Sequence, residues 1–172
     1  METQNCFHCG LDVVKKDEII FDEKSFCCNG CKTVYEIFSL NGLTEYYKFE
    51  STPGASPLDI NGRYDFLENI DIVKRLLEFQ ESGTAIVSLY IPHIHCSSCI
   101  WILENLNRLN PEIRNSQVNF HEKKVRVVYN PDSITLKNIV ELLCKIGYEP
   151  YISLENYETT KKKVDRDLIY KL

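Results

Sequence analysis

The segment Ile91-Pro92-His93-Ile94-His95-Cys96-Ser97-Ser98-Cys99-Ile100-Trp101 decides the fold that we predict for this chain. It follows a strand-like stretch and leads into a helix-like stretch, so its two cysteines lie on a turn where a helix begins. The unpaired amides and partial positive charge at a helix N-terminus stabilise a thiolate over a thiol. Thiolates bind soft metals such as Cu(I), and the Cys-x-x-Cys spacing lets both sulfurs reach one ion. This turn therefore predicts metal or redox chemistry.

The residues on either side of the turn predict a βαββαβ order, which is the ferredoxin-like arrangement. From Thr84 the apolar residues alternate as in a half-buried strand, with Ala85, Val87, Leu89 and Ile91 on one face. We expect a helix over about 98–110, strands over 113–120 and 125–129, a second helix capped by Thr135 and ended by Gly147, and a last strand over 150–154. The fold class is therefore α+β.

The first 50 residues predict a separate small module that is rich in cysteine. Cys6-Phe7-His8-Cys9-Gly10 has the geometry of a metal knuckle, 13–14 and 19–21 are read as a hairpin, and Phe26-Cys27-Cys28-Asn29-Gly30-Cys31 precedes a helical pattern. This order is typical of a treble-clef or zinc-ribbon-like module. Because about 45 residues have too little core to fold unaided, a structural metal is expected to stabilise them.

The spacing leaves the ligand set of this module open. The first pair is Cys6 with Cys9, and Cys31 is joined by either Cys27 or Cys28. Four thiolates suit a closed tetrahedral Zn(II) site, and copper is the alternative metal. His8 lies inside the knuckle, where we expect a solvated loop histidine rather than a ligand.

The cysteines are also the outlier in the composition. The chain has 172 residues, 44% hydrophobic and 26% charged, and seven of its eight cysteines fall into the two groups above. The remaining one, Cys144, is expected to be a core residue in a helix. The formal net charge of -5 argues against a nucleic-acid partner. Since no signal peptide or membrane span is apparent, we expect a soluble chain that starts in the cytoplasm.

Between the two modules we expect a linker over 51–81 that carries an amphipathic helix over 65–80, ended by Gly83. The aromatic patch Tyr46-Tyr47-Lys48-Phe49 is interpreted as packing surface. The domains are thus predicted as 1–50, 51–81, 82–155 and a polar tail over 156–172, whose basic residues suit the approach to a membrane helix.

A βαββαβ unit with Cys-x-x-Cys between its first strand and first helix resembles the heavy-metal-associated domain of copper chaperones and copper-pumping P-type ATPases. The form His95-Cys96-Ser97-Ser98-Cys99-Ile100-Trp101 resembles the bacterial branch associated with cytochrome oxidase assembly. That branch also tends to carry an upstream Cys-x-x-Cys-Gly and Phe-Cys-Cys-x-Gly-Cys module, matched here by 6–10 and 26–31.

The resemblance implies the N-terminal region of such a pump, at the cytoplasmic face of the bacterial inner membrane. It implies Cu(I) at Cys96 and Cys99, received from a copper chaperone or another Cu(I) donor. The pump's own membrane and nucleotide-binding domains are the other implied partners, and contact with the membrane would come only through a missing C-terminal part. The sequence has no phosphorylation motif and no nucleotide-binding loop, so this region is not expected to be an enzyme by itself.

The sequence departs from the common Gly-Met-Thr-Cys-x-x-Cys pattern of the family, because His93, Ile94 and His95 precede Cys96. Ile94 fits the role of the core anchor that the family's methionine fills. His95 is a further candidate ligand, although a partly exposed loop histidine is the preferred interpretation. Trp101 is expected to pack against the core.

Two other functions compete with copper delivery. A thiol-disulfide oxidoreductase would use Cys96 and Cys99, but its fold would start with βαβ and carry a later cis-proline. A zinc-dependent interaction module would use the N-terminal cysteines. Zinc as the transported ion is a narrower rival, disfavoured because the Cys-x-x-Cys turn lacks a nearby carboxylate.

Overall fold

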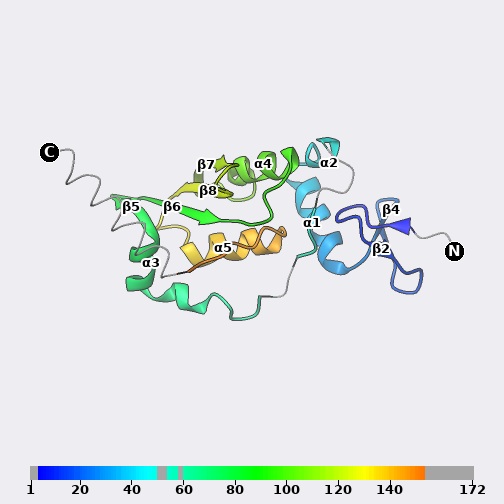
Figure 1. Ribbon diagram of the computed structural model, residues 1–172, viewed down its shortest axis with the longest axis horizontal. Helices are drawn as coiled ribbons and strands as arrows, with labels where there is room; N and C mark the ends of the chain where they lie inside the picture. The colour runs from blue at the N-terminus through cyan, green and yellow to red at the C-terminus, as the bar shows by residue number, and fades with distance from the viewer. Residues whose placement is uncertain (1–3, 50–53, 58–59, 154–172) are drawn as a thin grey trace.

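The computed structural model describes residues 4–49, 54–57 and 60–153. Figure 1 places the Cys-rich module, with α1, β2 and β4, at one end of the molecule and the four-stranded sheet towards the other. Among the described residues, no helix has the length and apolar character needed to cross a bilayer.

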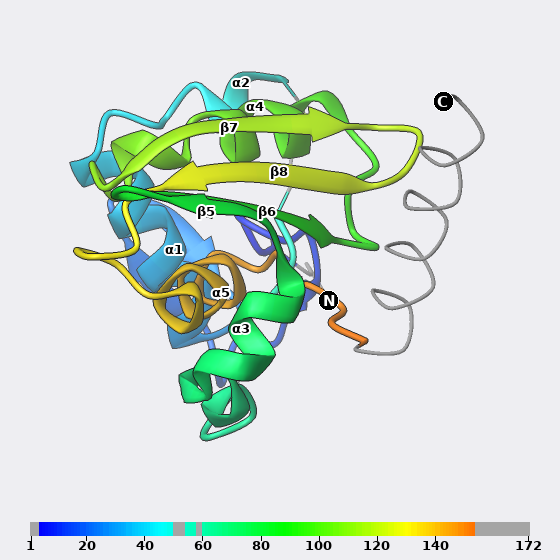
Figure 2. The same ribbon diagram turned by 90° about the vertical axis from the view of Figure 1, so that its left-hand side faces the viewer.

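The main sheet has the strand order β5-β6-β8-β7, and all neighbouring strands are antiparallel. Its strands are β5 (Leu77–Glu81), β6 (Thr84–Tyr90), β7 (Ile113–Asn119) and β8 (Lys124–Tyr129). Figure 2 shows these strands side by side, with α4 beside β7 and α5 below the sheet. The alternation predicted for β6 is confirmed, because Ala85, Val87 and Leu89 are fully buried.

Two helices follow the ferredoxin-like order. Helix α4 (Ser97–Glu104) continues into the 3₁₀ turn η2 (Leu106–Arg108), and α5 (Leu136–Lys145) lies after β8. Thr135 caps α5 in a reciprocal capping box with Asn138, as the sequence predicted for this start. Gly147 follows the end of α5 with a φ of 90°, which suits a glycine after a helix. Cys144 is buried in the core, as expected.

The N-terminal module consists of two short ribbons and two helices. Strand β1 (Gln4–Asn5) pairs with β2 (Asp12–Val13), and β3 (Ile19–Phe21) pairs with β4 (Lys24–Phe26). The predicted hairpin between 13–14 and 19–21 is therefore wrong, because β2 pairs with β1 across the knuckle and β3 pairs with β4 across Asp22-Glu23. The helical pattern after Cys31 is confirmed by α1 (Asn29–Leu40), and α2 (Tyr46–Phe49) follows it.

The long helix predicted over 65–80 is wrong. The segment contains the 3₁₀ turn η1 (Asp65–Glu68), the helix α3 (Ile70–Leu76) and then β5. Leu77 to Glu81 form a hairpin with β6 instead, across a turn in which Ser82 and Gly83 have φ values of 35° and 73°. Gly83 thus serves a strand turn rather than a helix end.

The last predicted strand is also largely absent from the described residues. Tyr151 makes a single antiparallel bridge to Tyr90, and Leu154 lies outside the described part of the chain. Strand β5 occupies the edge of the sheet beside β6, where the last strand of a βαββαβ unit was expected. The polar tail over 156–172 also lies outside the described residues.

Candidate metal centres

The first centre is a group of four sulfurs from two loops of the N-terminal module. The sulfurs of Cys6, Cys9, Cys27 and Cys31 all lie within 4.8 Å of one another. Cys9 Sγ is 3.6 Å from Cys27 Sγ, and Cys27 Sγ is 3.7 Å from Cys31 Sγ. Sulfurs at the corners of a tetrahedron with bonds of about 2.3 Å stand about 3.8 Å apart. The four side chains therefore fit one tetrahedral metal ion.

The start of helix α1 gives the sulfurs of Cys27 and Cys28 different positions. Cys28 is the residue before the helix, and its sulfur accepts a hydrogen bond from the Cys31 amide at 3.4 Å. This contact satisfies an amide that the first helical turn leaves unpaired. Cys28 lies outside the group of four, whereas Cys27 lies within it.

The first centre favours one thiolate even without a metal. The pKa of Cys6 is lowered to about 4, first by a hydrogen bond from Cys31 and then by the backbone amides of Cys9, Cys27 and His8. Burial raises the pKa of Cys27 to about 12. Donating to Cys6 raises the pKa of Cys31, and burial adds to this increase. Backbone amides aimed at a sulfur stabilise its thiolate, which is the form that binds a metal.

His8 is not the solvated loop histidine that we expected. Its side chain is fully buried, with Nδ1 2.9 Å from the Tyr47 hydroxyl and Nε2 3.2 Å from the Ala55 carbonyl oxygen. Burial lowers the pKa of His8 to about 4, so the ring is neutral at physiological pH. A Cβ at Gly54 would lie 2.1 Å from this ring, so only glycine fits there. His8 therefore fastens the knuckle to the segment that leads to the second module.

The second centre contains the sulfurs of Cys96 and Cys99, which stand 2.8 Å apart. Cys96 caps α4, because its sulfur accepts a hydrogen bond from the Cys99 amide at 3.3 Å. Solvent has little access to the pair, since Cys96 is 8% and Cys99 0% exposed. Because metal–sulfur bonds are about 2.3 Å long, an ion held between the two sulfurs requires them to rotate apart.

The two histidines before this pair lie close to it. His95 Nδ1 is 3.9 Å from Cys99 Sγ and 2.6 Å from the His93 carbonyl oxygen. The donor atoms of His95, Cys96 and Cys99 lie within 4.8 Å of one another, and His95 is exposed. His95 is thus both the exposed loop histidine that we preferred and a side chain within reach of the sulfurs.

Three residues beside the second centre were missed by the sequence analysis as site residues. Ser98 is fully buried and donates its hydroxyl proton to the Tyr46 carbonyl oxygen at 3.1 Å. The hydroxyls of Tyr46 and Tyr148 are 2.8 Å apart. Burial raises the pKa of Tyr148 well above its usual value, and its neighbours Tyr46 and Cys99 act in the same direction. Sequence spacing could not join these residues, because Tyr46 lies 52 positions from Ser98 and 102 positions from Tyr148.

Trp101 packs against the core as predicted, with its ring centroid 6.0 Å from that of Phe49. The aromatic patch is confirmed as packing surface at Tyr46, which is fully buried, and at Tyr47, which packs against both cores.

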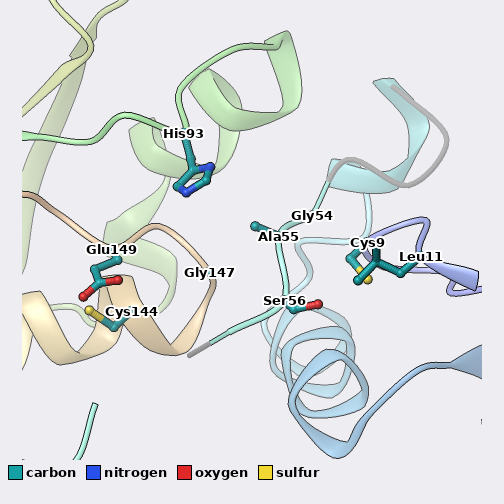
Figure 3. Close-up of a pocket in the computed structure, with 9 residues that line it drawn as sticks. All are labelled: Cys9, Leu11, Gly54, Ala55, Ser56, His93, Cys144, Gly147 and Glu149. Carbon is teal, nitrogen blue, oxygen red and sulfur yellow. The ribbon is translucent and has the colours of Figure 1, made fainter. Parts of the chain in front are cut away.

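A cleft of about 340 Å³ lies between the two modules. Figure 3 shows Cys9 with Ala55 and Ser56 on one side, and His93 and Glu149 on the other. One cysteine of the first sulfur group, Cys9, and one residue of the loop before the second, His93, therefore line the same cleft.

Cys144 also lines this cleft, but it is a poor nucleophile. It is 1% exposed, and burial raises its pKa to about 11. A rise of about two pKa units leaves about 100-fold less thiolate at neutral pH than an unperturbed thiol has. In the metal-free, reduced, folded protein we expect iodoacetamide to modify Cys144 at least tenfold more slowly than the more accessible Cys28. Mass spectrometry of peptides over time measures both rates. In denaturant the two should become equal, and a fast reaction at Cys144 in the folded chain would contradict its burial.

Comparison with known protein families gives two matches. Residues 5–80 match the model described as "Putative metal-binding domain of cation transport ATPase", and residues 88–149 match the heavy-metal-associated domain. The first match continues through the segment that we expected to be a linker. A search of curated proteins found no match.

Proposed function

The chain fits an N-terminal region of a heavy-metal P-type ATPase, because it carries two metal-binding domains of the kinds found there, and on this premise we propose that it binds Cu(I) through Cys96 and Cys99. The bound copper serves delivery to the membrane pump or regulation of it. The full protein is then a copper-translocating ATPase, and this region lies at the cytoplasmic face of the bacterial inner membrane. A copper chaperone or another Cu(I) donor loads the site, and the pump's membrane and nucleotide-binding domains are the further partners.

The observation that carries this proposal is the difference between the two centres. The first offers four sulfurs within 4.8 Å, whereas the second offers two sulfurs with one imidazole beside them. A four-thiolate site closes around its ion and suits structural Zn(II). A site with two soft ligands suits Cu(I), for which thiolate is a preferred ligand. We therefore assign Zn(II) to Cys6, Cys9, Cys27 and Cys31, and copper to the second centre.

Because only two or three protein ligands would hold the copper ion at the second centre, the ion can be transferred to a partner by ligand exchange. A partner's thiolate adds to the copper as a third ligand, and Cys96 or Cys99 then leaves, so no electron is transferred. Binding displaces the thiol protons of both cysteines to solvent. The start of α4 assists, because the helix N-terminus stabilises negative charge on the sulfurs. His95 is placed to act as a further ligand during the exchange, since its ring is exposed and lies 3.9 Å from Cys99 Sγ.

An anaerobic Cu(I) titration against a chromophoric chelator tests this proposal. The reduced, zinc-loaded wild type is compared with Cys96→Ser/Cys99→Ser and with the matched control Cys144→Ser, which replaces a buried cysteine outside both sulfur groups. We expect the double variant to lose one tight copper equivalent and to keep its zinc, while the control keeps both. If the double variant binds copper as tightly as the wild type, the N-terminal cysteines are the copper site and the assignment is wrong.

A further inference from the structure

The second centre is built partly from the first module. The buried Ser98 hydroxyl, in the first turn of α4, donates to the carbonyl oxygen of Tyr46 at 3.1 Å. Tyr46 begins α2, and Figure 1 shows α2 lying against the N-terminal part of α4. Because Ser98 stands directly before Cys99, this hydrogen bond fixes the backbone that carries one ligand sulfur.

The same tyrosine reaches Cys99 by a second route. The hydroxyls of Tyr46 and Tyr148 are 2.8 Å apart in a buried environment, and Tyr148 is a neighbour of Cys99. The paired hydroxyls therefore tie α2 to the turn that follows α5, next to the helix that carries Cys99.

Tyr46 and its neighbour Tyr47 are in turn tied to the first centre. The His8 ring stacks on Tyr46, with centroids 6.2 Å apart and an interplanar angle of 23°. His8 Nδ1 lies 2.9 Å from the Tyr47 hydroxyl. Since His8 stands between Cys6 and Cys9, the ring's position depends on the knuckle that holds the first metal.

We propose that Cys96 and Cys99 form a composite metal site in which Tyr46 of the N-terminal module is a positioning residue, so that metal at the first centre increases Cu(I) affinity at the second. This inference rests on the proposed function. The switching element is the Cys-rich part of the N-terminal module, whose own buried cluster is limited to Cys6, Val13, Phe26, Cys31 and Tyr35. So small a core depends on its metal. Loss of that metal frees the knuckle and so displaces His8. The contacts of Tyr46 with Ser98 and Tyr148 are then weakened. Coupling between two sites of this kind typically changes affinity by about 5–150-fold.

Three chains test the coupling by Cu(I) competition at neutral pH: the zinc-loaded wild type, zinc-loaded Tyr46→Phe, and a variant with serine at Cys6, Cys9, Cys27 and Cys31. The last one mimics the empty first centre and leaves no thiols there to capture copper. Tyr46→Phe keeps the ring and removes only the hydroxyl. Tyr90→Phe is the matched control, since Tyr90 is partly exposed at the end of β6.

We expect Cu(I) binding about tenfold weaker in the four-serine variant and several-fold weaker in Tyr46→Phe, with Tyr90→Phe unchanged. Because coupling is reciprocal, copper should also strengthen Zn(II) binding in the wild type by the factor seen for copper, and by less in Tyr46→Phe. A merely structural tyrosine would not produce this reciprocity.

Copper affinities that agree within twofold in all four chains would overturn the composite site while leaving copper binding at Cys96 and Cys99 intact. A wild type that binds no copper at these cysteines would instead overturn the proposed function, and this inference with it.

Discussion

Replacing Cys27 with serine is expected to abolish tight metal binding at the first centre and to unfold the N-terminal module, whereas replacing Cys28 leaves both intact. Cys27 contributes one of the four clustered sulfurs, but the Cys28 sulfur accepts the Cys31 amide and caps α1. Loss of a direct ligand should exceed the roughly 100-fold loss of affinity that follows removal of an outer partner. Serine is a preferred residue before a helix, so Cys28→Ser should change stability by no more than about 0.5 kcal/mol.

Zinc competition against a chromophoric chelator measures the affinities, and circular dichroism with and without zinc reports the fold of the module. The two variants differ by the same chemical change at adjacent positions, so each controls for the other. Zinc binding that survives Cys27→Ser but fails in Cys28→Ser would reverse the ligand assignment.

The second large effect is expected at Gly147, where α5 meets the segment between the modules. Gly147 has a φ of 90°, and a Cβ there would lie 2.5 Å from the Ala55 carbonyl oxygen. Gly147→Ala therefore adds backbone strain and overpacking, together about 2–5 kcal/mol. The close approach of Gly147 to Ala55 brings the second module against the segment 54–57. The Ala55 carbonyl oxygen in this segment also accepts a hydrogen bond from His8.

Urea unfolding of the zinc-loaded chain measures the cost, and Gly42→Ala is the control. Gly42 also has a positive φ, 66°, but a Cβ there meets nothing within 4 Å, so only backbone strain of about 1–2 kcal/mol is expected. If both substitutions lower the free energy of unfolding equally, the close approach of Ala55 to Gly147 does not contribute to stability.

Much of the second module could be predicted because its signals are local. The alternation in 84–91 and the capping box at Thr135 each depend on residues within a few positions of one another. Strand β5 could not be predicted in this way. Its residues continue the apolar spacing of α3, but pairing with β6 across the Ser82-Gly83 turn outweighs that helical preference. The pairing of the four N-terminal strands was predicted wrongly for a related reason. Each of these strands is only two or three residues long, so it carries little sequence pattern.

The candidate sites likewise contain features that local sequence predicts and features that only the folded chain reveals. Cysteine spacing alone identified both sulfur groups, because the residues of each loop are close in sequence. It could not choose between Cys27 and Cys28, since that choice depends on which sulfur caps α1. Nor could it find the partners of the second centre, because Tyr46 and Tyr148 are 102 residues apart and Ser98 and Tyr46 are 52 apart. Only the packing of the two modules brings these side chains together.

The division of labour between the two centres is tested most directly by X-ray absorption at the zinc and copper edges of the reduced chain, loaded with one equivalent of each metal. We predict zinc surrounded by four sulfurs, and copper bound by two sulfurs with at most one nitrogen, which His95 would supply. The copper signal should be lost in Cys96→Ser/Cys99→Ser while the zinc signal stays the same. Copper surrounded by three or more sulfurs, with zinc displaced from the protein, would contradict the account.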